Sequence, residues 1–327
     1  MKIFISLFDY ELNFCICKKS PMKPAVTESV SRPFIEEAVK EVDNPLRRVS
    51  ESTKKNERTS ISHFRNFIGE SVTLKEITPE HIKAFEYWLA KNKVAPGASA
   101  EYMRSLRAVI NRLGGNGKIL FKEVSTGKRR TSKSSNNEEE IGKIETKEIK
   151  ANTQECRARD TYLFSFYALG MPFADLVKLT TKNIHDGHII YRRQKTGEIV
   201  SVPIISKMQE IINKYHQDGC SYLMPYLTNG KPLQNYRQYQ NALRKYNRWL
   251  QCLSTKYDLP KLTSYTARRS WATIARKKGV DIHIIAKALG HTNPLTTLNY
   301  IKDIDYAEVD SASLVVIKAI KEAKPAA

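Results

Sequence analysis

Acidic residues are scarce in this chain of 327 residues. It carries 34 Asp and Glu against 54 Lys and Arg, so its formal net charge is +20. An excess of this size favours a partner rich in phosphate, because Lys and Arg that neutralise phosphates release condensed counterions. Nucleic acid is therefore the expected partner. A ribosomal-type structural protein or a protein that binds anionic membranes is the alternative.

The chain also lacks long apolar runs and an even number of cysteines. No stretch approaches the roughly 18 apolar residues of a membrane span. The first apolar run, Ile3 to Phe8, is short and is followed by Asp9 and Glu11, which argues against a signal peptide. The five cysteines are odd in number, and none are paired at zinc-finger spacing. A reduced, cytoplasmic compartment fits best, with no membrane partner and no metal site.

Proline, glycine and apolar spacing divide the chain into four parts. Residues 1–48 are expected to be an N-terminal extension with room for one short helix near Phe34 to Val42. Residues 49–124 carry helical apolar stripes, and Thr78-Pro79-Glu80 is typical of a helix start. Residues 125–137 have the Ser, Thr and Gly content of a linker. Residues 138–327 are expected to be a second domain.

The apolar period changes from helical to two inside the second domain. Asp186-Gly187 is a hairpin-turn signal, and Thr196-Gly197 marks a second turn before the strand-like stretch Ile199 to Ile205. The predicted fold is therefore mainly α with a small antiparallel β-sheet. The second domain is α+β, and the first is all helical.

Two segments concentrate positive charge. No acidic residue occurs from Gly219 to Tyr257, and the basic residues between the apolar positions of this stretch are expected to face outward and meet phosphate. The linker adds a second basic patch, for which an ordinary solvated loop is the alternative. The residues expected to bind the nucleic acid are Arg237, Arg244, Lys245 and Arg248 in the first segment and Lys128, Arg129, Arg130 and Lys133 in the linker.

Four short motifs follow one another in the second domain. Lys195 lies at the tip of the second hairpin, Tyr265-Thr266-Ala267-Arg268 and Leu289-Gly290-His291 come next, and Tyr300 lies nine residues after the histidine. A phenol with a pKa of about 10 is a weak nucleophile and needs help to attack a phosphodiester. An Arg fork matches the non-bridging oxygens, a Lys can protonate the leaving oxygen, and a His can donate to the phosphate. Such chemistry requires neither a metal nor a cofactor.

This ordered set resembles the tyrosine recombinase (phage integrase) family, and its flanking residues look most like integrases of Bacteroides-type mobile elements. The resemblance covers residues of about 50 to 315 and implies a helical core-binding domain and a catalytic domain that form a clamp on DNA. By position it implies that Tyr300 is the nucleophile of a 3′-phosphotyrosine intermediate. The other implied site residues are Arg268 as a phosphate clamp, Lys195 as the general acid, His291 as a phosphate donor, Tyr265 at the family's His position and Asp175 as a supporting acid.

The sequence departs from the family pattern at two positions. Pro172 stands where the family has its first Arg, and a proline cannot clamp a phosphate. Tyr265 replaces a histidine, so it can donate a hydrogen bond but carries no positive charge. A relocated cation is then expected, with Arg159 first, Arg157 second and Lys178 third in order of preference. Ordinary helix-surface charge is the alternative for each of them.

Three functions fit these observations. The first is a site-specific recombinase or integrase that is monomeric when free, binds double-stranded DNA and forms a homotetramer on paired sites, as the resemblance implies. The second is a catalytically weakened recombinase that only binds DNA, suggested by Pro172 and Tyr265. The third is a type IB topoisomerase, which shares the chemistry.

Overall fold

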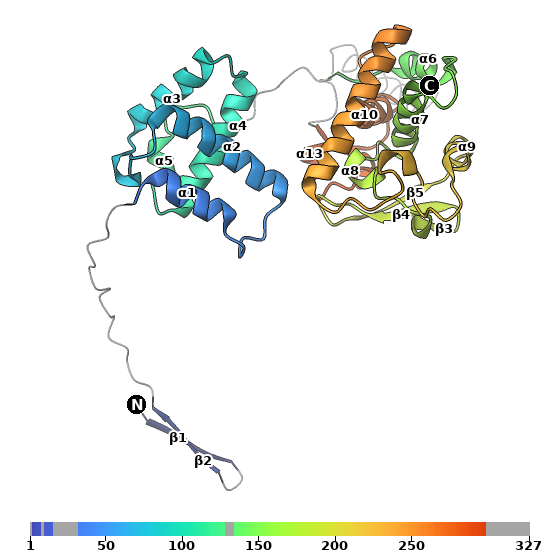
Figure 1. Ribbon diagram of the computed structural model, residues 1–327. Helices are drawn as coiled ribbons and strands as arrows, with labels where there is room; N and C mark the ends of the chain where they lie inside the picture. Colours follow the sequence, from blue (N-terminus) through green and yellow to red (C-terminus); the bar gives the residue numbers. More distant parts are fainter. Residues whose placement is uncertain (1, 8–9, 16–31, 128–133, 299–327) are drawn as a thin grey trace, which may run out of the picture. The chain divides into compact units, whose positions relative to one another are not determined.

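The computed structural model describes residues 2–7, 10–15, 32–127 and 134–298. The chain divides into two compact units, residues 1–130 and 131–327 (Figure 1). At the start of the first unit, β1 (Lys2–Leu7) and β2 (Tyr10–Cys15) pair as an antiparallel hairpin. This hairpin falls in the segment that the sequence predicted to be an N-terminal extension with one short helix near Phe34 to Val42.

Helices form the rest of the first unit. They are α1 (Phe34–Asp43), α2 (Glu51–Ile68), α3 (Pro79–Lys91), α4 (Pro96–Arg112) and the short α5 (Gly117–Leu120), with a 3-10 turn, η1, at Leu74–Glu76. The Thr78 hydroxyl caps α3 by accepting from the backbone of His81, and Pro79 occupies the first helical position. The helix start expected at this point is therefore confirmed.

Helix α1 belongs to the core of the first unit. Its residues Phe34, Ile35, Ala38 and Val42 are buried in one apolar cluster with side chains of α2, α3 and α4. The helical unit thus includes a helix that lies before the expected boundary at residue 49. The reason is physical, because the amphipathic face of α1 is removed from water only by packing on α2 and α4.

The second unit is helical around a three-stranded sheet. Its helices are α6 (Glu138–Thr146), α7 (Gln154–Tyr167), α8 (Phe173–Leu176), α9 (Ser206–Tyr215), α10 (Tyr236–Tyr257), α11 (Thr266–Lys277), α12 (Ile282–Ala288) and α13 (Leu295–Leu298). Two 3-10 turns, η2 (Thr181–Asn183) and η3 (Pro225–Leu227), connect them. Among the described helices, none combines the length and hydrophobicity that crossing a bilayer requires.

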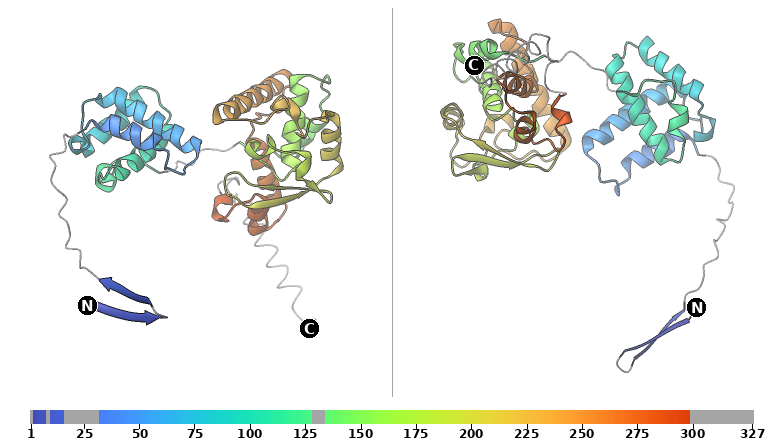
Figure 2. Two further views of the ribbon diagram at one scale, coloured as in Figure 1. Left: turned by 60° about the horizontal axis from the view of Figure 1, so that its bottom comes forward. Right: turned by 180° about the vertical axis from the view of Figure 1, so that it is seen from behind.

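The sheet consists of β3 (Ile184–His185), β4 (His188–Arg192) and β5 (Ile199–Pro203), antiparallel and in that order. Asp186 and Gly187 both have positive φ, at 46° and 72°, as the predicted hairpin turn requires. Every second residue of β4 and β5 is buried, so one face of the sheet packs on the core. The views in Figure 2 show the sheet along one edge of this unit. The predicted fold class is confirmed.

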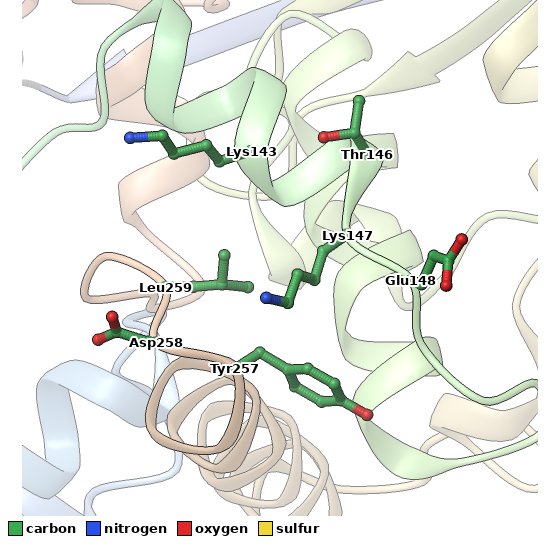
Figure 3. A pocket seen from close by; sticks show the side chains of 7 residues that line it. All are labelled: Lys143, Thr146, Lys147, Glu148, Tyr257, Asp258 and Leu259. Carbon is green, nitrogen blue, oxygen red and sulfur yellow. The ribbon is translucent and has the colours of Figure 1, made fainter.

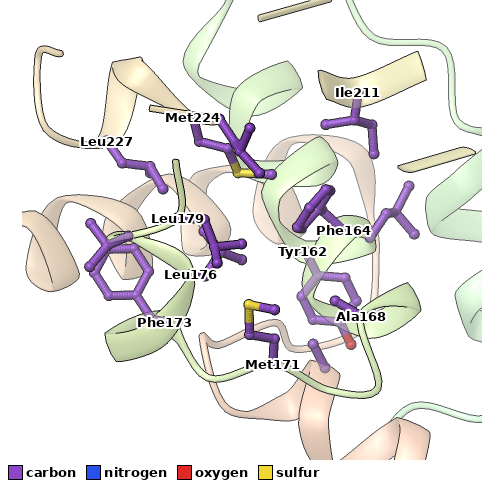
Figure 4. Packing of buried hydrophobic residues seen from close by; sticks show 14 of the residues in the cluster. Tyr162, Phe164, Ala168, Met171, Phe173, Leu176, Leu179, Ile211, Met224 and Leu227 are labelled. Carbon is purple, nitrogen blue, oxygen red and sulfur yellow. The ribbon is translucent and has the colours of Figure 1, made fainter. Parts of the chain in front are cut away.

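Helix α7 forms the centre of this core. Tyr162 and Phe164 are completely buried, and they pack with Met171, Leu176 and other apolar residues from the chain that follows α7 (Figure 4). Helices α9, α10 and α11 also pack against α7. This packing fixes the segment from Gly170 to Asp175, which leads directly to the motif residues.

Candidate active site

Arg268 is the most deeply buried of the motif residues, with 1% of its surface exposed on the first turn of α11. Its Nη1 donates to the carbonyl oxygen of Gly170 (3.0 Å), and its Nη2 donates to that of Leu289 (2.6 Å). Gly170 has a φ of +68°, and a Cβ at this position would lie 2.6 Å from the Cα of Arg268. The turn after α7 therefore needs glycine both for its conformation and for its close approach to α11.

His291 contacts Arg268 directly. Its Nε2 lies 3.1 Å from Nη2 of Arg268, and its Nδ1 lies 2.9 Å from Oγ1 of Thr297. Burial lowers the pKa of His291 to about 4, and the charges of Arg268, Arg193 and Lys195 act in the same direction. The structure thus brings the Leu-Gly-His motif onto the arginine of the preceding motif.

The hairpin between β4 and β5 carries Lys195 to the same place. Within its turn, the backbone of Gly197 donates to the carbonyl oxygen of Arg193 (2.8 Å). Next to Lys195, the hydroxyl of Thr196 donates to the carbonyl oxygen of Gly290 (3.0 Å). Lys195 is exposed at the tip, where a flexible ammonium is suited to delivering a proton.

Asp175 supports this hairpin from α8. It is 6% exposed, and its Oδ1 accepts from the backbone of Gln194 (2.8 Å). Burial raises the pKa of Asp175, while the hydrogen bond from Gln194 and the charges of Arg193, Arg268 and Lys178 oppose that rise. The carboxylate therefore lies within the cationic cluster and orients the loop that bears Lys195.

Arg193 is a member of this cluster that the sequence reasoning missed. It is 6% exposed, its Nε forms an ion pair with Oδ2 of Asp175 (3.2 Å), and its Nη1 donates to the carbonyl oxygen of Leu289 (2.8 Å). A signal was present in the sequence. The buried positions of β4 are Ile189 and Tyr191, and continuing that period of two places Arg193 on the inner face.

Tyr265 lies at the start of α11 and is 39% exposed. Its backbone donates to the hydroxyl of Thr263 (3.3 Å), and the guanidinium of Arg269 lies 5.3 Å from the centre of its ring. Tyr300 lies outside the described residues, as do the linker residues Lys128, Arg129, Arg130 and Lys133.

Two of the three candidates for the relocated cation lie among other groups. Arg159 donates to Oδ1 of Asp160 (2.9 Å) and to the carbonyl oxygen of Lys147 (2.7 Å). Arg157 lies 5.7 Å from the ring centre of Tyr226, a residue of η3.

Lys178, the third candidate, is close to Asp175. The side-chain amide of Gln194, oriented to satisfy both of its neighbours, accepts from Nζ of Lys178 (3.2 Å). Lys178 and Arg193 line one cavity of about 350 Å³ together with Asp175. Of the three candidates, Lys178 is thus the one that the structure brings to Asp175 and to Gln194, the neighbour of Lys195.

The basic residues of α10 differ in their surroundings. Arg237, Arg244 and Arg248 are exposed. Lys245 is only partly exposed: its Nζ donates to the carbonyl oxygen of Tyr226 (3.3 Å) and lies 4.9 Å from the ring centre of Trp249. Burial lowers the pKa of Lys245. A phosphate would therefore reach the three arginines more readily than this lysine.

Another hollow of the second unit is unrelated to the motif residues. A cavity of about 420 Å³ opens between the C-terminal ends of α6 and α10, and Figure 3 shows the seven side chains that line it. They include Lys143, Lys147 and Tyr257, and none of the motif residues is among them. Across the part of the chain that the structure describes, no three His, Cys, Asp or Glu side chains gather in a way that could hold a metal ion.

Comparison with known proteins identifies the family. Residues 137–306 match the model of the phage integrase family, and residues 33–117 match that of the phage integrase SAM-like domain. The chain belongs to the phage integrase family. Its class is that of the tyrosine-type site-specific recombinases, because curated relatives include tyrosine recombinase XerC of Rickettsia canadensis (strain McKiel). That relative is 27% identical over 262 residues, which cover 74% of this chain and 83% of the relative.

Solved structures share the fold at lower identity. The Tn1549 transposon integrase in complex with circular intermediate DNA has a TM-score of 0.65 and 15% identity, over 86% of this chain and 99% of that chain. A lambda integrase dimer bound to a COC′ core site has a TM-score of 0.64 and 16% identity, over 84% of this chain and 98% of that chain. The SAM-like match begins at residue 33, which agrees with the inclusion of α1 in the helical core.

Proposed function

We propose that this recombinase cuts and rejoins DNA strands through a phosphotyrosine at Tyr300, without a metal or a high-energy cofactor. The observation that carries the proposal is the convergence of three groups: Arg268 donates to the carbonyl oxygen of Leu289, Thr196 of the Lys195 hairpin donates to that of Gly290, and His291 contacts Arg268. Three separate elements thereby direct positive charge and hydrogen-bond donors to one place. Such preorganised groups stabilise the charge that develops on a phosphate under attack.

Each side chain has a role that follows from its chemistry. Arg268 holds the non-bridging oxygens with its planar fork, and His291 donates to them once the phosphate offsets the neighbouring cations. Lys195 protonates the leaving 5′ oxygen. Tyr265 adds a neutral hydrogen-bond donor at the edge of the site, and Asp175 keeps the hairpin oriented.

The DNA-binding surface of the catalytic unit follows from the exposed cations of α10. Arg237, Arg244 and Arg248 contact phosphates, and the linker residues named above extend that contact. The Tn1549 and lambda structures contain DNA, and one of the lambda structures is a tetramer bound to a Holliday junction. By analogy, the two units of this chain clamp a duplex, and four copies assemble on paired sites from monomers in the cytoplasm.

A nicked suicide substrate tests the proposal. The nick lies near the cleavage site, so the released strand end diffuses away and the covalent intermediate accumulates. We expect the wild-type chain to form a protein–DNA adduct that survives denaturation, and Tyr300→Phe to form none. The DNA affinity of Tyr300→Phe should stay within about threefold of the wild-type value, because the duplex is held mainly by phosphate contacts and the hydroxyl adds little. An adduct that persists in Tyr300→Phe contradicts the assignment of the nucleophile.

A second candidate function has one observation in its favour. Pro172 forms the N-cap position of α8 where the family pattern has an arginine, so the chain can be a recombinase relative that binds DNA without cutting it. The same substrate separates the two functions. Tight binding without any adduct in the wild-type chain favours the binding protein.

A further inference from the structure

Two buried arginines meet at a single backbone oxygen. The carbonyl oxygen of Leu289 accepts from Nη2 of Arg268 at 2.6 Å and from Nη1 of Arg193 at 2.8 Å. The two residues come from different elements, Arg268 from α11 and Arg193 from the end of β4. Their guanidinium groups therefore lie side by side, 1% and 6% exposed.

Positive charge is concentrated in this cluster. Asp175 forms an ion pair with Arg193, and burial together with the charges of Arg268, Arg193 and Lys195 lowers the pKa of His291. Like charges brought together away from water repel one another, and the cost of burying them falls when an anion joins them. The cluster is thus a site prepared for an anion such as a phosphate.

The position of Arg193 also answers the question raised by Pro172. Asp175 lies three residues after Pro172, and its backbone donates to the carbonyl oxygen of Pro172 (3.0 Å). Because Arg193 forms its ion pair with Asp175, its guanidinium lies beside the segment in which the family pattern places the first arginine. The bond to Leu289 uses Nη1, and Nε lies 3.2 Å from Oδ2 of Asp175 as an ion pair without a hydrogen bond. An Arg fork has five N–H donors in all.

We propose that Arg193 supplies the second guanidinium at the scissile phosphate, in place of the arginine that Pro172 excludes. This inference rests on the proposed function and names a further residue of the same site. Arg268 and Arg193 then each donate hydrogen bonds to the non-bridging oxygens, because planar guanidinium groups match the geometry of a phosphate. The alternative is that Arg193 has a structural role only: it holds the hairpin in place through its contacts with α8 and with the turn after α12.

The charge of the substrate distinguishes an Arg193 that contacts the phosphate from an Arg193 that only supports the structure. A methylphosphonate at the scissile position replaces one non-bridging oxygen by a methyl group and removes the negative charge. A residue that acts by neutralising this charge becomes dispensable on such a substrate, whereas a residue that only maintains the fold stays equally necessary on both substrates.

The experiment compares cleavage of matched nicked duplexes that carry either a phosphodiester or a methylphosphonate. For Arg193→Ala we expect cleavage of the phosphodiester to fall about 10²- to 10³-fold, the loss that follows removal of one donor to developing charge. On the methylphosphonate, the same variant is expected within about tenfold of the wild-type chain, one decade being a difference of about 1.4 kcal/mol. Equal impairment on both substrates overturns the proposal.

Arg192→Ala is the matched control. Arg192 is the adjacent residue of the same type, but it is exposed, and its Nη1 donates to the carbonyl oxygen of Gly197 within the hairpin (2.7 Å). This variant is expected to cleave both substrates at nearly the wild-type rate. A loss in Arg192→Ala equal to that in Arg193→Ala also contradicts a specific role for Arg193.

Two further measurements keep the result interpretable. Because Arg193→Ala leaves the carboxylate of Asp175 buried without its ion pair, a second variant combines Arg193→Gln with Asp175→Asn and removes both charges. We expect it to melt near the wild-type temperature and to lose cleavage of the phosphodiester as Arg193→Ala does. If the wild-type chain forms no adduct at all, the proposed function fails, and binding of orthovanadate still tests Arg193. We expect Arg193→Ala to weaken vanadate about tenfold or more, since hydrogen bonds to charged groups contribute about 1.5–3 kcal/mol; unchanged vanadate affinity overturns the proposal.

Discussion

His291 shows how the surroundings of a single residue decide its protonation. A guanidinium only donates, so in the contact with Arg268 the Nε2 of His291 accepts, and Nδ1 carries the proton toward Thr297. A pKa lowered to about 4 by burial and by three nearby cations keeps the ring neutral at pH 7. The ring becomes a donor to phosphate only when an anion enters and offsets those cations.

The titration of His291 tests this account. The pKa of a histidine in the unfolded chain is about 6.5, whereas that of His291 in the folded chain is about 4. As the pH falls between these two values, the unfolded state binds a proton and the folded state does not, so unfolding becomes more favourable. The stability that the neutral ring contributes is therefore present above this window and lost within it. We expect the melting temperature of His291→Gln to fall less between pH 7 and pH 4.5 than that of the wild-type chain.

The direct measurement is the chemical shift of the His291 ring in an NMR titration of the DNA-free protein. The reference is the usual histidine pKa of about 6.5. A His291 ring that titrates near this usual value, rather than near 4, contradicts the electrostatic account of the site.

At the scale of elements, the site depends on the hairpin between β4 and β5 and on the turn after α12. Gly290 lies where they meet: its φ is +63°, and a Cβ there would lie 2.7 Å from Cγ of Arg193 and 3.0 Å from Cγ2 of Val200. The glycine of the Leu-Gly-His motif thus ends α12 and also clears space for the stem of Arg193. Both functions are lost when a side chain is added.

Gly290→Ala is expected to displace Arg193 and to lower the stability of the second unit by about 2–6 kcal/mol, from a strained φ of about 1–3 kcal/mol together with overpacking of about 1–3 kcal/mol. Gly187→Ala is the matched control, because Gly187 also has a positive φ, at +72°, but open space around its Cβ position. Chemical denaturation of the two variants measures the difference. Equal losses of stability show that Arg193 does not press on this position.

The same elements show which features could be predicted from the sequence. Thr78 and Pro79 begin a helix, and Asp186-Gly187 forms a hairpin, because local backbone preference decides both. Arg193 was missed because an arginine after a strand usually faces water. The period of two in β4 places it on the inner face, and its contacts with Asp175 and Leu289 satisfy the buried charge there.

Helix α7 shows where the sequence could not predict the direction of a side chain. Its residues are buried on most sides, so the sequence has no clear apolar face from which the direction of a charged side chain follows. Arg159 and Arg157 were therefore ranked first and second for a role at the phosphate without any means of telling where they point. The structure places them against Asp160 and Tyr226, and Lys178 beside Gln194 and Asp175.

For the whole molecule, the net charge of +20 makes binding to DNA depend on salt. The logarithm of the binding constant falls linearly with the logarithm of the salt concentration, with a slope of about −0.9 for each phosphate contact. The exposed and the tethered cations of α10 should differ in their share of this slope. Arg248 is exposed, whereas Lys245 is tied to Tyr226 and Trp249.

We expect Arg248→Ala to reduce the magnitude of the slope by about 1 and to weaken binding to specific and unrelated duplexes alike, as loss of one phosphate contact does. Lys245→Ala should change the slope by much less than Arg248→Ala, although it removes the same formal charge. Fluorescence anisotropy between low and physiological salt measures both variants against the wild-type chain. If both alter the slope equally, net charge alone governs binding; if only Arg248→Ala does, the exposed arginines of α10 form the phosphate contact.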